Sequence, residues 1–264
     1  MAMMQTMRRL VCSRKTNSRV SFYNIKRIFY NLSSSPLIKN IRIRVERTLK
    51  QGPPIDLSTI KCKQYLRRHI NSKTKLVVLC VDLVGSTKLT LSLSPQELIS
   101  IINIFSTEMS MIISGYGGYV LKYVGDAVIG IFPADFDSQK ACLNSIMCAK
   151  TMLNIITQVI NPVFYNKLPL IEIKIGIDLG DSMIVLYGKN VEIAHIDIIG
   201  AGISIAAKIT ALAKPNQILI SENIFETIVE VAKDISLKKL DIVNRNWDYK
   251  NIKTNKILNV YVLH

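Results

Sequence analysis

Cysteine is scarce in this chain of 264 residues, and none of its five cysteines forms a C-x-x-C pair. The thiols are spread along the sequence, at Cys12, Cys62, Cys80, Cys142 and Cys148. Three of them stand in apolar runs, where a free thiol behaves as a small hydrophobic side chain. The pattern excludes a metal site built on sulfur and favours a reducing compartment, so we expect a cytoplasmic location.

Histidine, tryptophan and long apolar runs are scarce as well. Neither His69 nor His195 has a second histidine at helical spacing, which argues against a metal site built on imidazole. The single tryptophan, Trp247, has no aromatic neighbours on a basic groove, so stacking on nucleic acid bases is not expected. Apolar runs such as "LVVLCV" at 76–81 are far shorter than the ~20 residues that cross a bilayer. We therefore expect neither a transmembrane span nor a nucleic acid partner.

Acidic residues are nearly absent from the first 75 residues. This segment holds 18 of the 34 basic residues and 2 of the 19 acidic ones, so its net charge is +16 and that of the remainder is −1. Serine, asparagine and proline interrupt it, and no period of 3.6 or 2 is sustained. We expect a basic N-terminal extension over residues 1–73, with a break at "GPP", and a separate domain over residues 74–264.

Four interpretations of this extension stay open. An arginine-rich, acid-poor and serine-containing start resembles an organelle transit peptide. The same charge fits contact with nucleic acid phosphates or with an anionic membrane surface. A solvated tail explains it equally well. As a partner we retain a membrane surface, because a nucleic acid is not expected.

From residue 75 onward the hydrophobic pattern becomes regular. It predicts strands over 75–83, 170–180, 182–188, 195–199, 216–221, 235–243 and 256–263, and a strand hairpin over 117–132. It predicts helices over 94–117, 138–160 and 200–213, and a short helix from Glu222. The first long helix begins with a serine N-cap and Pro95, and the second is expected to end at "NP". These alternating units predict one sheet flanked by helices.

Two aspartates stand out against this apolar pattern. Asp82 ends a buried strand, and Asp126 follows Gly125 at the turn of the hairpin "GGYVLKYVGDAVIGIF". If the two strands are neighbours in the sheet, the carboxylates converge, and hard divalent cations prefer such oxygen ligands. Two Mg²⁺ ions about 4 Å apart, bridged by two carboxylates, would polarise a phosphoryl group and activate an attacking oxygen.

The segment after the first aspartate fits a phosphate group. It reads "LVGST" and leads into a helix. We expect the backbone N–H groups of Val84, Gly85, Ser86 and Thr87 to face a polyphosphate at the positive end of that helix. Each aspartate alone is explained by a capping or turn role, but together with this loop they favour a metal and phosphate site.

Five ordered blocks resemble the catalytic domain of class III adenylate and guanylate cyclases. They are "VDLVGST", "YVLKYVGDAVIGIF", "IKIGIDLG", "IDIIGAGISIAAKI" and "PNQILIS", within roughly residues 74–263. The resemblance implies an α+β fold, a ferredoxin-like βαββαβ sandwich, in a homodimer whose two chains wrap head to tail and share their active sites. It also implies an adenylate cyclase that converts ATP to 3′,5′-cyclic AMP and pyrophosphate with two Mg²⁺ or Mn²⁺ ions.

The resemblance assigns roles to the matching positions. Asp82 and Asp126 match the two metal-binding aspartates, and the carbonyl of Leu83 matches their backbone companion. Lys122 and Asp197 match the pair that reads the base, and they would serve the partner chain's active site. The lysine would donate to adenine N1 and the carboxylate would accept from the exocyclic amine. Guanine inverts both groups, so the resemblance implies ATP.

The block "GAGISIAAK" departs from the family. Ser204 stands where the family has an asparagine that orients the ribose, and Lys208 stands where it has an arginine that steadies the α-phosphate. Lysine lacks the planar fork of arginine and serine offers a single hydroxyl, so we expect weak activity, with a loss of roughly 10² in rate. Their i, i+4 spacing keeps both on one helix face. Lys256 or Lys253 would hold the terminal phosphates, unless the two belong to a solvated basic loop.

Two other functions stay in competition. A catalytically impaired cyclase-like domain that binds nucleotide or dimerises is favoured by Ser204 and Lys208 and disfavoured by the intact Asp82 and Asp126. An enzyme that joins nucleotides between molecules, as GGDEF proteins do, is disfavoured because "YVGDAV" lacks the second glycine and the acidic residue after it. Adenylate cyclase is the leading hypothesis.

Overall fold

The computed structural model of the protein describes residues 36–53, 58–242, 247–251 and 254–264. Its strands are β1 (Lys73–Leu83), β2 (Tyr119–Val124), β3 (Ala127–Pro133), β4 (Ile173–Tyr187), β5 (His195–Ile199), β6 (Gln217–Ser221), β7 (Leu237–Lys239) and β8 (Val260–Leu263). Its helices are α3 (Pro36–Gln51), α4 (Ser58–Arg67), α5 (Ser86–Ser92), α6 (Pro95–Gly115), α7 (Ser138–Ile155), α8 (Asn161–Phe164), α9 (Ala201–Leu212) and α10 (Glu222–Ile228). A π-helical turn, Ile156–Ile160, joins α7 to α8.

The strands form one mixed sheet. β1, α6, β2, β3, α7 and β4 make a βαββαβ unit whose strands lie in the order β2-β3-β1-β4, with every neighbouring pair antiparallel. This is the predicted ferredoxin-like arrangement, and it places β1 in the middle. β6 adds in parallel to β4, and β8 and β7 continue the sheet. The predicted α+β fold class is confirmed.

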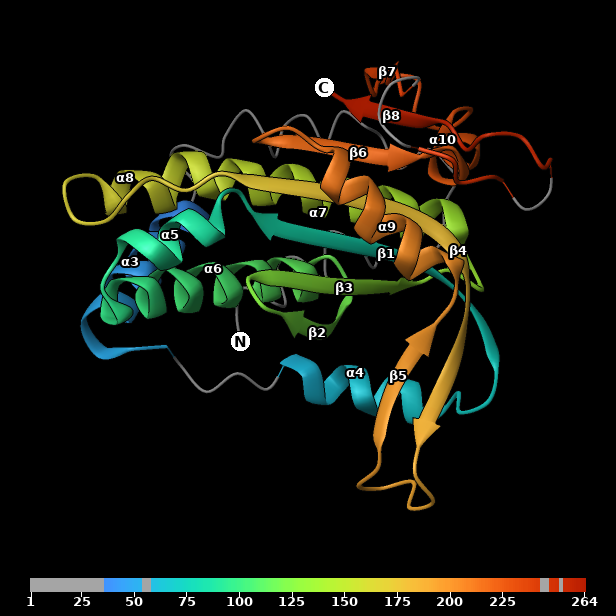
Figure 1. Ribbon diagram of the computed structural model, residues 1–264, viewed down its shortest axis with the longest axis horizontal. Helices are drawn as coiled ribbons and strands as arrows, with labels where there is room; N and C mark the ends of the chain where they lie inside the picture. The colour runs from blue at the N-terminus through green and yellow to red at the C-terminus, as the bar shows by residue number, and fades with distance from the viewer. Residues whose placement is uncertain (1–35, 54–57, 243–246, 252–253) are drawn as a thin grey trace.

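Helices cover both faces of this sheet (Figure 1). On β1, Val77 and Val81 point into the main core with α6 and α7, while Leu76 and Cys80 belong to a second core with α4 and α9. This alternation is the period of two that a strand buried on both faces requires. The centre of the sheet is therefore fixed from both sides, and the ends of its strands are left to form a site.

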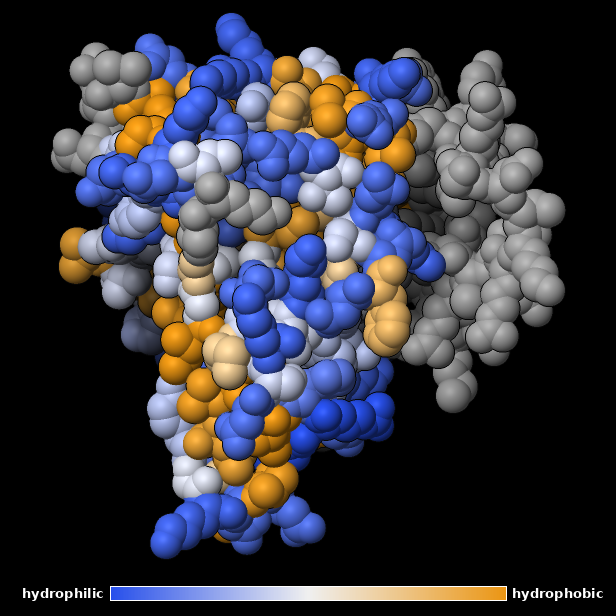
Figure 2. Space-filling view, turned by 90° about the vertical axis from the view of Figure 1, so that its right-hand side faces the viewer, coloured by the Kyte–Doolittle hydropathy of each residue, from blue (hydrophilic) through white to orange (hydrophobic). Residues whose placement is uncertain are grey.

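β4 is a single long strand across the predicted break between residues 180 and 182. Asp181 and Ser182 stay paired with Lys75 and Thr74 of β1, so no turn forms there. The last part of β4 leaves the body and pairs with β5 in a two-stranded projection, which we call the arm (residues 183–199) (Figure 1). Apolar side chains are exposed along the arm, in the lower half of the molecule in Figure 2. They are Met183, Tyr187, Val191, Ile193 and Ile199.

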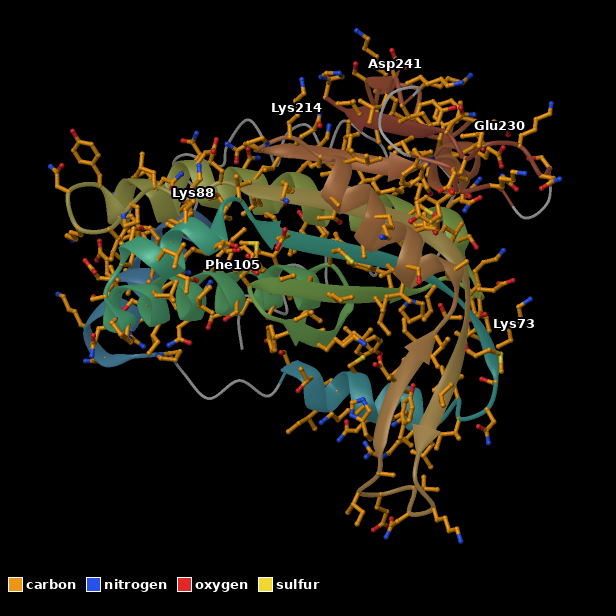
Figure 3. All side chains as sticks on the ribbon, viewed as in Figure 1. Lys73, Lys88, Phe105, Lys214, Glu230 and Asp241 are labelled. Atoms are coloured by element: carbon orange, nitrogen blue, oxygen red, sulfur yellow. The ribbon has the colours of Figure 1, made fainter. Side chains whose placement is uncertain are left out.

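α6 follows the sequence prediction closely. A capping box starts it: the side chain of Ser94 accepts from the backbone N–H of Glu97, and the side chain of Glu97 accepts from that of Ser94. Among the described residues it is the one helix long and apolar enough to cross a membrane by length and composition. In the structure its apolar side packs in the main core, where Phe105 is buried against the sheet (Figure 3).

Two boundaries differ from the prediction. The helical path does not end at Asn161–Pro162, because the π-helical turn continues directly into α8 and Pro162 lies in the first turn of α8, where proline is tolerated. The two late strands are shorter than predicted: among the described residues, continuous pairing covers only 237–239 and 260–263, and Ile257 adds an isolated bridge to Lys250.

Part of the predicted basic extension is packed onto the domain. Arg44 of α3 donates to Glu108 of α6 from Nε (2.7 Å) and from a terminal nitrogen (2.5 Å). Glu108 is buried, so this ion pair compensates a charge in the interior. α4 buries Cys62 and Leu66 against the sheet face that faces α9. Both helices therefore belong to the folded body, and residues 1–35 lie outside the described residues.

Candidate active site

Two carboxylates meet where β1 ends and the β2–β3 hairpin turns. Val81 pairs with Val128, so the end of β1 lies beside the beginning of β3. This register brings Asp82 next to Asp126; we call the two the carboxylate pair. Burial raises the pKa of Asp82 above its ordinary value, and the negative charge of Asp126 raises it further. The carboxylates of Asp82 and Asp126 therefore lie together in one partly buried site, as predicted from the sequence.

The turn holds Asp126 in a conformation that suits a cation. Gly125 has a φ of 60°, in the left-handed region that glycine adopts without strain. The Oδ2 atom of Asp126 is buried and has no hydrogen-bond donor. A buried carboxylate oxygen without a donor is costly unless a cation or other partner compensates it. No group of three or more histidine, cysteine or acidic side chains gathers anywhere in the described residues. A cation here would therefore be held by the carboxylate pair and by oxygens from the backbone and a substrate.

Lys174 completes this cluster, and the sequence reasoning missed it. It lies on β4 directly opposite Asp82 of β1, and its Nζ is 3.2 Å from Asp82 Oδ2. Its positive charge acts against the effect of burial on the pKa of Asp82. The signal that could have found it is the strand register, because directly opposed residues of opposite charge interact across a sheet.

The loop after β1 only partly fits the predicted phosphate contact. Leu83 is buried, and Gly85 takes a left-handed φ of 69° just before α5. The backbone N–H of Val84 donates to the carbonyl of Glu172 at 2.9 Å, so the expectation that it faces a phosphate is wrong. Ser86 and Thr87 begin α5, whose N-terminus has no side-chain cap. Three of the four predicted N–H groups therefore lie at an uncapped helix start.

Lys122 and Asp197 form an ion pair between β2 and β5, and we call them the inter-strand pair. Nε2 of His195 lies 3.9 Å from Asp197 on the same strand. A bulge between Val120 and Lys122 interrupts the register of β2. The side chain of Lys122 is 34% exposed and that of Asp197 16%, so solvent reaches the pair. The structure thus brings together two residues 75 positions apart, as the resemblance implied.

Ser204 and Lys208 lie on the exposed side of α9. Both residues are exposed, and the hydroxyl of Ser204 donates to the carbonyl of Gly200 at 3.4 Å. Within the described residues Lys208 forms no ion pair, and neither side chain is bonded to the carboxylate pair. Their common face is confirmed, and the structure does not bring them to Asp82 or Asp126 of the same chain.

The late lysine is also exposed. Lys256 precedes β8, and its backbone N–H donates to the hydroxyl of Thr254 at 3.4 Å. Lys253, the alternative candidate, lies outside the described residues. The assignment of a terminal phosphate to either lysine stays a prediction.

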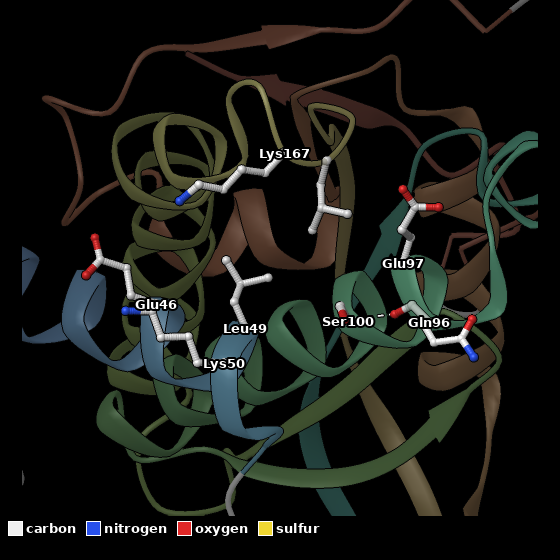
Figure 4. Close-up of a pocket in the computed structure, with 8 residues that line it drawn as sticks. Glu46, Leu49, Lys50, Gln96, Glu97, Ser100 and Lys167 are labelled. Atoms are coloured by element: carbon white, nitrogen blue, oxygen red, sulfur yellow. Dashed lines mark hydrogen bonds between the residues drawn. The ribbon is translucent and has the colours of Figure 1, made fainter.

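Two cavities of the described residues bear on where a nucleotide could bind. Asp126 lines a cavity of about 70 Å³, far below the several hundred that ligand pockets occupy. A cavity of about 610 Å³ lies elsewhere, between α3, the start of α6 and the loop after α8 (Figure 4). Its lining includes Glu46, Lys50, Glu97 and Lys167. The larger cavity therefore lies away from the carboxylate pair, and the one that Asp126 lines is too small for a nucleotide.

Comparison with known proteins identifies the class. The family model of the adenylate and guanylate cyclase catalytic domain matches residues 69–264. This chain belongs to that family. Its fold also matches the adenylyl cyclase CyaB of P. aeruginosa with a TM-score of 0.62 and 22% identity, over 73% of this chain and 95% of that one. A bacterial light-regulated adenylyl cyclase matches with a TM-score of 0.59 and 19% identity, over 94% of this chain and 66% of that one.

The curated relatives are named as cyclases of different nucleotides. A cytidylate cyclase of Escherichia coli is 29% identical over 62% of this chain and 37% of that protein. A cytidylate cyclase of Staphylococcus aureus is 29% identical over 67% of this chain and 45% of that protein. A uridylate cyclase of Rhodovulum is 26% identical over 65% of this chain and 73% of that protein. The chain thus spans less than half the length of the two cytidylate cyclases.

Proposed function

We propose that this chain is a nucleotidyl cyclase that acts on ATP or CTP, whose bases present an amine beside an unprotonated ring nitrogen. The observation that carries the proposal is the carboxylate pair, set beside Lys174 at the end of the central strand of a cyclase-family sheet. In the reaction the 3′-oxygen of the ribose attacks the α-phosphorus of the same molecule. One P–O bond forms, the bond to the pyrophosphate leaving group breaks, and the hydroxyl proton is released to solvent.

The residues of the carboxylate pair fit divalent cations. Asp82, Asp126 and the carbonyl of Leu83 would hold two Mg²⁺ or Mn²⁺ ions, which supply activation of the 3′-hydroxyl and neutralisation of the phosphates. The unpartnered Oδ2 of Asp126 and the raised pKa of Asp82 support this assignment. Lys174, whose Nζ lies 3.2 Å from Asp82 Oδ2, would offer the triphosphate a further cation.

The inter-strand pair supports an amino base. Adenine and cytosine each present an amine beside an unprotonated ring nitrogen, whereas guanine and uracil present a carbonyl beside an N–H. Lys122 can only donate hydrogen bonds and an ionised Asp197 can only accept them. With Lys122 at the ring nitrogen and Asp197 at the exocyclic group, the placement that the family resemblance implies, the pair complements adenine and cytosine and opposes guanine and uracil. A base that enters between them would replace their mutual ion pair with two hydrogen bonds.

ATP and CTP are both compatible with this chemistry. ATP is the substrate that the family resemblance implies for a lysine and an aspartate at these positions. CTP is favoured by a separate observation, the similarity to two proteins named cytidylate cyclase. Adenine and cytosine present the same pair of hydrogen-bonding groups and differ in the size of the ring system. Hydrogen bonds from the inter-strand pair do not distinguish between these two sizes.

A homodimer would complete the site. Within the described residues, Lys122 pairs with Asp197 and Asp82 pairs with Lys174, and the small cavity that Asp126 lines includes neither member of the inter-strand pair. In a head-to-tail dimer, the inter-strand pair, Ser204 and Lys208 of one chain would face the carboxylate pair of the other. The exposed apolar side chains of the arm support such an association. We also propose a cytoplasmic location, because the pattern of cysteines favours a reducing compartment.

Variants of the carboxylate pair test the proposal. We expect Asp82→Asn and Asp126→Asn each to lower cyclic nucleotide formation by at least about 10², because the cations lose a ligand. Mn²⁺ binding, followed by electron paramagnetic resonance, should weaken in the same variants. Asp181→Asn is the matched control, since Asp181 is an exposed acid of β4 that pairs with Lys73 at 2.9 Å. Full activity of Asp126→Asn would refute the proposed role of the pair.

A catalytically impaired cyclase-like domain is the second candidate, favoured by Ser204 and Lys208. The substitutions Ser204→Asn and Lys208→Arg, made together, separate the two functions. An active cyclase should gain turnover from them, since the arginine fork and the amide restore contacts to phosphate and ribose. A domain that only binds nucleotide should form no cyclic product with or without them.

A further inference from the structure

α4 contacts both strands that carry the inter-strand pair. It lies across the same sheet face, between β2 and the arm (Figure 1). Toward β2, the ring of Tyr65 stacks on Tyr119 with a centroid distance of 5.0 Å and an interplanar angle of 12°. At the other end of the helix, the hydroxyls of Ser58 and Tyr123 are hydrogen bonded at 3.1 Å. Because Lys122 stands between these two tyrosines on β2, α4 fixes the strand on both sides of it.

Toward the tip of the arm, Arg67 makes the polar contacts of α4. Nε of Arg67 donates to the carbonyl of Val191 at 2.7 Å, and a terminal nitrogen donates to the carbonyl of Glu192 at 2.7 Å. The same terminal nitrogen is 3.4 Å from the carbonyl of Ala194. These carbonyls belong to the loop at the tip of the arm, directly before β5 and Asp197. A guanidinium that donates to several carbonyls at once fixes their relative positions more firmly than a single bond does.

Apolar packing fills the space between the two attachments. Cys62 and Leu66 of α4 are buried with Leu121 of β2 and with Ile196 and Ile198 of β5. These apolar neighbours flank both members of the inter-strand pair in sequence. A close-packed layer of this kind resists compression and transmits displacement. A shift of α4 would therefore move one strand relative to the other.

We propose that α4 is a brace that sets the separation of Lys122 and Asp197, and that Arg67 is a positioning residue for base selection. The proposal rests on the proposed function, because the inter-strand pair is taken as the reader of the base. A donor and an acceptor distinguish an amino edge from a carbonyl edge only when both are held within about 0.5 Å of their geometry. The arm stands out from the body, so its tip depends on Arg67 for that precision.

Arg67→Gln tests the brace. This substitution removes the positive charge and the planar guanidinium group. We expect the ratio of activity on ATP and CTP to activity on GTP and UTP to fall about tenfold, as expected for a lost charged hydrogen bond. Amide hydrogen exchange should accelerate in residues 188–199 and stay unchanged in β1 and β3. Arg67→Lys should lie between wild type and Arg67→Gln. Arg68→Gln is the matched control, because Arg68 is the exposed neighbour and forms no ion pair with any described residue.

The outcomes separate this proposal from the proposed function. If the wild-type protein forms no cyclic product from any nucleotide, the proposed function fails, while the exchange measurement still decides whether Arg67 holds the arm. If the wild type is active and Arg67→Gln keeps both its base selectivity and its slow exchange, the brace is refuted. Faster exchange with unchanged selectivity would refute the positioning role and leave Arg67 as a contributor to stability only.

Discussion

A buried carboxylate on β4 should make the stability of the protein depend on pH. Asp178 is 2% exposed, and burial raises its pKa from the ordinary value of 3.8 to about 6. Donors oppose this shift: Nδ2 of Asn223 donates to Asp178 Oδ1 at 3.1 Å, and the side chain of Ser221 and the backbone of Leu179 also contribute. The effect of burial on the pKa exceeds the opposite effect of these donors, so the folded state favours the protonated acid.

The sign and size of the effect follow from linkage. Because the folded pKa lies above the unfolded one, the contribution of Asp178 is fully present below about pH 4 and is lost as the pH rises through about 6. A difference of about 2 pKa units corresponds to about 3 kcal/mol. Roughly half of this is lost by pH 5 and the rest by about pH 7. At neutral pH the ionised, buried Asp178 therefore lowers the free energy of unfolding.

Asp178→Asn removes the ionisation and keeps the size of the side chain. We expect it to raise the free energy of unfolding by up to about 3 kcal/mol at pH 7.5, or roughly 6–12 °C in Tm, and by about half as much at pH 5. Thermal unfolding at the two pH values, followed by circular dichroism, measures this. The exposed Asp181→Asn should stay within about 0.5 kcal/mol at both. An Asp178→Asn effect that is the same at pH 5 and pH 7.5 would show that the reasoning is wrong.

Two further predictions concern stability. Arg44→Ala leaves the buried Glu108 without its partner and should lower the free energy of unfolding in urea by about 3–5 kcal/mol. The joint change Arg44→Met with Glu108→Leu should be close to neutral. An Arg44→Ala variant as stable as wild type would contradict the role of the buried ion pair. Gly176→Ala would place a methyl group 2.4 Å from Thr210 Oγ1 on α9, so we expect a loss of about 1–3 kcal/mol. Gly202→Ala is its control, with the nearest atom at 3.5 Å, and should be tolerated.

Much of the fold could be predicted from local pattern. The alternation of "HIDII" predicted β5 at its observed bounds, and the serine N-cap followed by Pro95 marked the start of α6. β4 could not be predicted as one strand, since it continues past residue 181 only because β1 and then β5 pair with it. Pairing partners distant in sequence leave no local signal, and for this reason the ends of several strands were predicted inaccurately.

The candidate site divides in the same way. Asp82 and Asp126 could be predicted because each interrupts an apolar strand pattern, and family resemblance supplied Lys122 and Asp197. Lys174 was missed because its role depends on the register between β1 and β4. The contacts of Arg67 join residues more than 120 positions apart and had no local signal. Residues that break a pattern are visible in one sequence, whereas residues that act through a tertiary contact are not.

Incubation of the purified protein with ATP, CTP, GTP and UTP in separate reactions tests the central claim most directly. Each reaction contains Mn²⁺, and the 3′,5′-cyclic product is quantified by liquid chromatography and mass spectrometry, with Asp126→Asn as the inactive control. We predict cyclic product from ATP or CTP and little from GTP or UTP, because Lys122 and Asp197 complement an amino edge. Product formed mainly from GTP or UTP would contradict the proposed base selection, and no cyclic product from any of the four would contradict the cyclase function itself.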